Sequence, residues 1–121
     1  MLTAADLRLI NSVAARRFGA AENPGVDDGQ LAEAVAAQTA GHDAYARAAS
    51  LAAALLSGPV FSSAPKQTAL LALHCSLSLD GVVLLAPQGV VAGMITGLAR
   101  GGEVAGFARW LEDRAVPSTG G

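Results

Sequence analysis

The chain has 121 residues, which suits one domain with a single hydrophobic core, and its formal charge of −2 argues against nucleic-acid binding, which needs clustered basic residues. Apolar residues make up 52% of it but aromatic residues only 4%, so Ala, Leu and Val must build a core of closely packed helices. One cysteine and two histidines supply neither a disulfide framework nor a zinc pattern, and we expect no metal and no cofactor.

The sequence predicts a cytoplasmic protein without a membrane partner. Its first ten residues, MLTAADLRLI, carry charges and lack the long apolar stretch of a secretory signal. The residues between Asp80 and Arg100 are uncharged and approach the roughly 20 that span a bilayer. Pro87 lies in their middle and is followed by several glycines. We therefore expect a short extended or turn segment over 82–86, and then a buried helix of small residues.

Helical signals recur along the whole chain, and no alternating stretch requires a sheet. Thr3 and Asp6 resemble a capping box that opens the first helix. The polar segment AAENPGVDDG is typical of a turn, and Asp27 or Asp28 can cap the helix that follows it. The expected helices cover about 3–18, 28–40, 42–57, 65–79, 88–99 and 103–114.

The helix expected over 65–79 has apolar residues on almost every side, which indicates a central and buried position. Pro65 suits its first turn, where a missing amide hydrogen costs nothing. Within this helix we expect Cys75 to pack in the core, and the imidazole of His74 to be partly buried with its hydrogen bonds satisfied.

These elements predict an all-α fold in a single domain. Six helices form a compact bundle around the helix at about 65–79 and occupy residues 1–115. No internal repeat or domain boundary interrupts them, and residues 116–121 are expected to form a disordered tail.

The loop before the central helix reads GPVFSSAPKQTAL at 58–70. Together with the order of the helices, it resembles the Doc (death-on-curing) branch of the Fic/Doc family over nearly the entire chain, from Leu2 to Arg114. The family's loop reads His-x-Phe-x-(Asp/Glu)-(Ala/Gly)-Asn-(Lys/Gly)-Arg, commonly followed by Thr-Ala, and the matching window here is PVFSSAPKQTA. The early segments RFG and DG are similar to the family as well. The resemblance implies a Fic/Doc-like bundle and, in active members, transfer of phosphate or AMP from a nucleotide to a protein hydroxyl.

The same resemblance implies that the catalytic positions of the family are lost, and we expect no catalytic residue. The family's histidine base falls on Pro59, and its magnesium-holding acid falls on Ser63. Its phosphate-contacting asparagine and arginine fall on Pro65 and Gln67. A general base supplies roughly 10²–10⁴ in rate and an arginine on the transferring phosphate about 10³–10⁵, so little of the mechanism would remain. The retained positions are Phe61, Ala64, Lys66, Thr68 and Ala69.

The other motif residues have structural explanations beside the functional ones. We expect Phe61 to plug the core under the loop. We expect Ser62 and Ser63 to be turn and capping residues, with Ser63 or Ala64 just ahead of the helix. The first turn of that helix presents backbone amides and a lysine charge, which could together attract an anion. The candidate anion-binding residues are Lys66, Gln67 and Thr68.

Two classes of function follow. The first is a catalytically inactive Doc-like module of toxin–antitoxin type that binds a protein partner, either an antitoxin-like segment in a groove between alanine-rich helices or a related subunit. The second is a Doc/Fic-type transferase with a rebuilt site, to which Glu22, Asp27 or Asp28 would bring acidic groups. A scaffold subunit that packs its helices at 42–57 and 88–99 on another copy or on an active relative is a third, weaker alternative. Nucleotide binding is disfavoured in the first class and required in the second.

Overall fold

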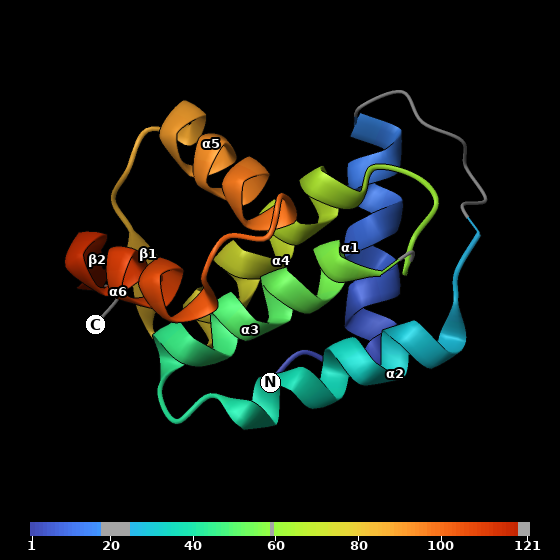
Figure 1. The fold of residues 1–121 in the computed structure, drawn as a ribbon, viewed down its shortest axis with the longest axis horizontal. Coiled ribbons are helices and arrows are strands. Elements are labelled where there is room, and N and C mark those ends of the chain that lie inside the picture. Colours follow the sequence, from blue (N-terminus) through green and yellow to red (C-terminus); the bar gives the residue numbers. More distant parts are fainter. Residues whose placement is uncertain (18–24, 59, 119–121) are drawn as a thin grey trace.

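The computed structural model describes residues 1–17, 25–58 and 60–118, and in these it confirms the all-α bundle of six helices (Figure 1). Most expected ranges agree with the observed bounds to within about two residues, the usual scatter of helix ends. The helix expected to reach residue 40 ends at 37 and continues as a 3₁₀ turn. The helix at 88–99 is not buried as expected, because only Val91, Ile95 and Leu98 of its residues are buried. Among the described residues, none of the helices combines the length and the hydropathy that a membrane span requires. The helices are α1 (Ala4–Arg17), α2 (Asp28–Ala37), α3 (Ala44–Ser57), α4 (Pro65–Leu79), α5 (Gln88–Ala99) and α6 (Val104–Arg114), with a 3₁₀ turn, η1, at Gln38–Ala40.

Side-chain caps fix where three of the helices begin. At α1 the Thr3 amide donates to the Asp6 carboxylate (2.8 Å) and the Asp6 amide donates to the Thr3 hydroxyl (3.2 Å), so the predicted capping box is present. These bonds lower the pKa of the Asp6 carboxyl below its ordinary value. Asp27 and Asp43 each accept a hydrogen bond from the amide three residues later (3.0 and 2.7 Å), which starts α2 and α3.

Two helices, α3 and α4, lie side by side in the middle of the bundle (Figure 1). α3 packs against α2, α4, α5 and α6, while α4 packs against α1, α3 and α5. Every residue of α3 except Ser57 is at least partly buried, because its many alanines let the neighbouring helices approach closely. α4 keeps an exposed side that includes Ser78 and Leu79. The central position expected for α4 is therefore shared with α3, which is the more enclosed helix.

His74 and Cys75 lie on α4 at the border between its buried and exposed sides. The prediction that Cys75 packs in the core is wrong, because the following residues, Ser76 and Leu77, turn inward and leave the thiol exposed. Partial burial and the Asp6 carboxylate nevertheless raise the pKa of this thiol. His74 is partly buried as predicted, but the prediction that its hydrogen bonds are satisfied is wrong. Its Nε2 atom has no hydrogen-bond partner among the described residues, and burial lowers the pKa of the imidazole.

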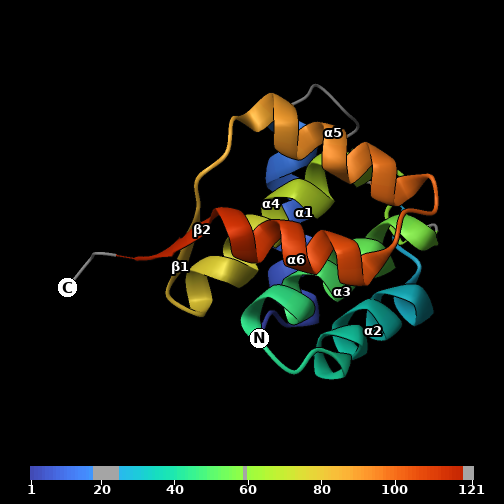
Figure 2. The same ribbon diagram turned by 60° about the vertical axis from the view of Figure 1, so that its left-hand side comes forward.

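The extended segment expected over 82–86 is present as the short strand β1 (Val82–Leu84). Its antiparallel pairing with a second short strand, β2 (Ala115–Pro117), is not predicted by the sequence pattern. Val83 faces Val116 across the pair, and Figure 2 shows the strands beyond the end of α6. Strands of three residues alternate too briefly for a period of two to be recognised. Because β2 reaches Pro117, the ordered fold continues into the tail expected at 116–121, of which 119–121 lie outside the described residues.

Candidate functional site

The motif loop between α3 and α4 is tied to the segment that precedes α2. The Asp27 amide donates to the Val60 carbonyl (2.9 Å), and the Ser62 amide donates to the Gly25 carbonyl (3.0 Å). Between these two bonds lies an isolated antiparallel bridge. The Gly25 amide donates in turn to the Ser62 hydroxyl (2.6 Å), which confirms a turn-stabilising role for this serine. The loop backbone is thus fixed by hydrogen bonds to a segment that is distant in the sequence.

Phe61 lies in the core beneath this loop, as predicted. The residue is 5% exposed, and its neighbour Val60 is fully buried. An aromatic ring enclosed in this way is not presented for stacking on a nucleotide. Pro59, which occupies the position of the family's histidine, lies outside the described residues. The buried cluster around Phe61 includes Leu2, Leu7, Leu31, Ala34, Leu51, Leu55, Ala69 and Ala72.

The helix that follows the loop begins without a side-chain cap. Its N-cap is Ala64, which adopts the left-handed conformation (φ 50°, ψ 47°), and Pro65 begins the helix as predicted. Of the two positions expected just ahead of the helix, Ala64 and not Ser63 holds the cap. The predicted capping by a serine side chain is therefore wrong, because alanine has no side-chain oxygen. A non-glycine residue in this conformation costs about 1–2 kcal/mol, so the surrounding contacts must stabilise the turn.

A buried polar network that the sequence does not predict supplies such contacts. The side-chain amide of Asn11, which is 1% exposed, donates to the Ser63 carbonyl and to the Thr68 hydroxyl, both at 2.9 Å. The Thr68 hydroxyl donates to the Ala64 carbonyl (2.7 Å), which also accepts from the Thr68 amide (2.9 Å). Asn11 thereby joins α1 to both sides of the turn into α4.

This network corrects the candidate anion-binding set. Thr68 does not belong to it, because the residue is fully buried and both its hydroxyl and its amide are bonded inside the protein. Lys66 is exposed and Gln67 is partly exposed, and both line a cavity of about 190 Å³ between α4 and α5. Leu70, Ala92, Ile95 and Thr96 form the rest of its lining, which is largely apolar. Anion binding by Lys66 and Gln67 stays a prediction.

Two of the three acidic residues expected at a rebuilt site lie within the described ranges, and they have different partners. Asp28 forms an ion pair with Arg8 of α1. Asp27 caps α2 and donates its amide to the motif loop, so the fold places this residue beside the loop. Glu22 lies outside the described residues. Within the described ranges, no three His, Cys, Asp or Glu side chains lie together in a way that could hold a metal ion.

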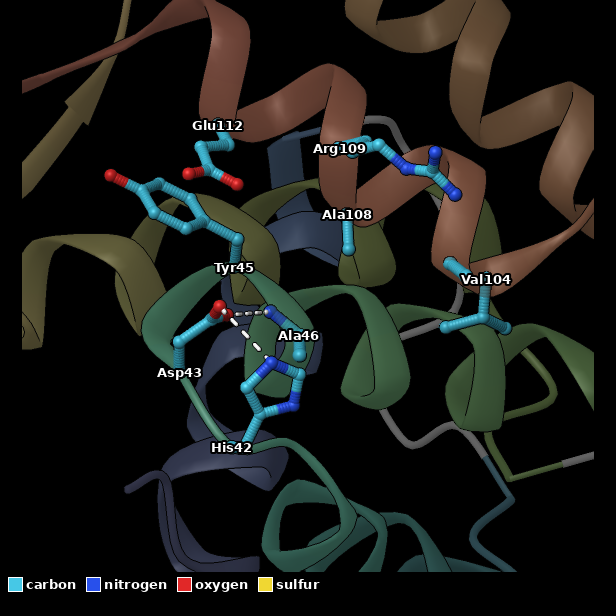
Figure 3. A pocket seen from close by; sticks show the side chains of 9 residues that line it. His42, Asp43, Tyr45, Ala46, Val104, Ala108, Arg109 and Glu112 are labelled. Carbon is cyan, nitrogen blue, oxygen red and sulfur yellow. Dashed lines mark hydrogen bonds and ion pairs between the residues drawn. The ribbon is translucent and has the colours of Figure 1, made fainter.

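A second candidate site is a cavity of about 480 Å³ between the start of α3 and α6, which we call the α3–α6 groove (Figure 3). Small side chains leave the space between the two helices open, and the aromatic ring of Tyr45 forms part of its wall. The groove is the kind of surface expected between alanine-rich helices. Its lining consists of His42, Asp43, Tyr45, Ala46, Val104, Ala105, Ala108, Arg109 and Glu112.

Charged groups of both signs surround the α3–α6 groove. Figure 3 shows the Glu112 carboxylate beside the Tyr45 ring, while the Arg109 guanidinium points toward the other end. The Asp43 carboxylate is fixed by its bond to the start of α3 and lies 3.6 Å from Nε2 of His42, an exposed residue. The sequence does not indicate that these charged residues lie together, because they belong to segments far apart in the chain and share no motif.

No model of a known protein family matches the chain, and no curated protein matches it significantly in sequence. The Fic/Doc resemblance therefore rests on the order of the helices and on the partial motif at 59–69.

Proposed function

We propose that the chain is a catalytically inactive Doc-like module of toxin–antitoxin type, which acts by binding a protein partner. The observation that carries this proposal is the division of the motif positions between core and surface. Positions that agree with the family's motif are the buried residues Phe61, Thr68 and Ala69, together with the partly buried Ala64 and the exposed Lys66. Positions that depart from it include the partly or fully exposed residues Ser63, Pro65 and Gln67.

The residues that hold the loop in place are therefore different from those at which the family carries out its reaction. The buried positions hold the loop against the core and join it to α4, so they are needed whether or not the protein is an enzyme. The exposed positions are those at which the family contacts magnesium and phosphate. Here they carry a hydroxyl, which is a weak magnesium ligand, and an amide without the charged fork of arginine. A shaped surface remains after the catalytic groups are gone.

The α3–α6 groove is the surface that we assign to the partner. Its alanines allow the backbone of another helix to approach closely, and Tyr45 supplies the kind of aromatic group that often anchors an interface. Glu112 and Arg109 bring opposite charges to its rim. An amphipathic helical segment with apolar residues on one face and charges of both signs beside it fits this lining.

The first test is a calorimetric titration of the purified protein with ATP and with GTP, each with and without magnesium. We expect no binding heat at about 1 mM nucleotide, which corresponds to an affinity weaker than roughly −4 kcal/mol. Binding that strengthens when magnesium is added would contradict the proposal.

The second test concerns the groove. Ala105→Glu places a charge on an exposed helical position in the groove, and Ala32→Glu places the same charge on an exposed position of α2 as a matched control. Both variants should keep the helical circular dichroism of the wild type. A protein partner captured by the wild type and by Ala32→Glu should be lost from Ala105→Glu. Equal capture by both variants would exclude the groove as the partner site.

A rebuilt Doc/Fic-type transferase is the second candidate, and the position of Asp27 beside the motif loop favours it. In this alternative a carboxylate from the segment before α2 replaces the lost acid of the loop. Transfer of a labelled phosphate or AMP group to a protein hydroxyl, abolished by Asp27→Asn, would support it over the binding module.

A further inference from the structure

The outer face of α1 carries a narrow apolar stripe that no part of the described chain covers. Leu9 is 63% exposed and Val13 is 43% exposed, although both lie in the middle of a helix. Asp6 precedes Leu9 by one turn, and Arg16 follows Val13 by one turn. The four residues are spaced three, four and three apart, which is the spacing that places side chains along one seam between two helices. We call them the α1 seam.

An apolar hollow continues the α1 seam toward α4. It has a volume of about 340 Å³ and lies between the two helices, with Ile10, Cys75 and Leu79 in its lining. Leu79 is itself 63% exposed. The seam and the hollow together form one apolar surface, of the kind that marks an interaction site in soluble proteins.

We infer that a second copy of this chain covers this surface, with its own α1 running antiparallel across the α1 seam. A two-fold axis through the middle of the seam brings Leu9 of each copy beside Val13 of the other. The same axis brings Asp6 of each copy beside the Arg16 and Arg17 of the other, because these groups lie about 7–9 Å to either side of the midpoint at 1.5 Å per residue. Each residue of the α1 seam then meets a complementary residue of the other copy.

The order of charges selects this arrangement over the alternatives. A parallel pair of α1 helices would place Asp6 beside Asp6 and Arg16 beside Arg16, which is repulsive at both ends. An isologous interface needs a surface that is complementary to itself, and the order acidic, apolar, apolar, basic along the α1 seam meets this condition. The carboxylate of Asp6 is charged at neutral pH, as an ordinary aspartate is, and its bond from the Thr3 amide holds it at the start of α1.

This inference does not depend on the proposed function. Figure 1 shows α1 toward one side of the bundle and α6 toward the other, and none of the residues that line the α3–α6 groove belongs to α1. A partner bound in the α3–α6 groove and a second copy on α1 would therefore occupy different surfaces.

The test is sedimentation equilibrium of the whole chain over a range of concentrations. The wild type should reversibly form a dimer, and Leu9→Glu should weaken the dimer at least about tenfold by burying unpaired charges at the interface. Leu85→Glu is the matched control, because Leu85 is 61% exposed and lies outside the seam. This control should dimerise as the wild type does. A wild type that stays monomeric at about 1 mM, or a dimer that Leu9→Glu leaves intact, would overturn the inference.

A charge-swapped pair tests whether the charges at the two ends of the α1 seam meet across the interface. Arg16→Glu/Arg17→Glu in one chain and Asp6→Lys in another each replace attraction by repulsion within their own homodimers. Each variant should be monomeric alone, and an equal mixture should form a 1:1 heterodimer, because both ends of the seam are then complementary again. Circular dichroism confirms that each variant is folded, since Asp6→Lys removes the capping box of α1. Folded variants that fail to associate when mixed would contradict the antiparallel arrangement.

Discussion

Replacing Asn11 by alanine should destabilise the protein more than any exposed change on α1. The substitution removes two hydrogen bonds of 2.9 Å, to the Ser63 carbonyl and to the Thr68 hydroxyl. Each such bond contributes about 1 kcal/mol net, and a buried partner left unsatisfied costs about 1–3 kcal/mol. Loss of the side chain also leaves a small cavity at a position that is 1% exposed. We therefore expect the free energy of unfolding to fall by about 2–4 kcal/mol.

Thr68→Val tests the other end of the same network with little change of shape. It removes the hydroxyl that joins Asn11 to the Ala64 carbonyl, but that carbonyl keeps its bond from the backbone amide of residue 68 (2.9 Å). Asn11 likewise keeps its bond to Ser63. The expected loss is therefore smaller, about 1–2 kcal/mol. The double variant should lose less than the sum of the two, with a coupling of at least about 0.5 kcal/mol, because each substitution removes a partner of the other.

Urea denaturation followed by far-ultraviolet circular dichroism measures the free energy of unfolding of the wild type, the two single variants and the double variant. Ser12→Ala, at a partly exposed neighbouring position, is the control and should change stability by no more than about 0.5 kcal/mol. If Asn11→Ala costs no more than this control, or if the two single losses add within about 0.3 kcal/mol, the network does not hold α1 to α4 as the structure indicates.

Three further substitutions or reactions test local features of the fold. Gly93→Ala on α5 should raise the free energy of unfolding by about 0.5–1 kcal/mol, because alanine favours the helix and its Cβ would meet nothing within 4 Å. Gly41→Ala should lower the free energy of unfolding in the same urea titration, because its Cβ would overlap the backbone of α3. Burial lowers the pKa of His74 below its ordinary 6.5, so the folded state binds fewer protons than the unfolded state. Urea titrations should therefore show the free energy of unfolding falling as the pH drops below about 6.5. His74→Leu should remove the contribution of His74 to this pH dependence, and the control His42→Ala should leave that contribution in place. Cys75 is exposed but its raised pKa should make alkylation by iodoacetamide slower than that of free cysteine at about pH 8, which the rate of mass increase measures.

The helices could be predicted from the sequence because their signals are local. The capping box at Thr3 and Asp6, the proline at 65 and the glycine at 58 all act within one turn of the residues they affect. The side facing the core was harder to predict on α4. Its leucines surround the helix, so periodicity alone could not show that the side bearing Cys75 would stay exposed.

The features that could not be predicted are pairings between distant segments. β1 and β2 are three residues each and lie at opposite ends of the C-terminal helical pair, so neither carries a recognisable pattern alone. The α3–α6 groove depends on how closely two alanine-containing helices pack, which their composition does not determine. Asn11 looks like an ordinary polar residue of an amphipathic helix until the carbonyl of Ser63, 52 positions away, is placed beside it.

The motif loop therefore depends for its shape on residues outside the motif. Asn11 fixes the turn into α4, and the backbone of Gly25 and Asp27 fixes the opposite end of the loop. None of these contacts uses a side chain at a position where the family's chemistry takes place. The side chains at the partly exposed positions Ser63 and Gln67 can therefore be replaced without loosening the loop. A loop held in this way keeps its form whatever side chains its exposed positions carry, which is consistent with the proposed binding module.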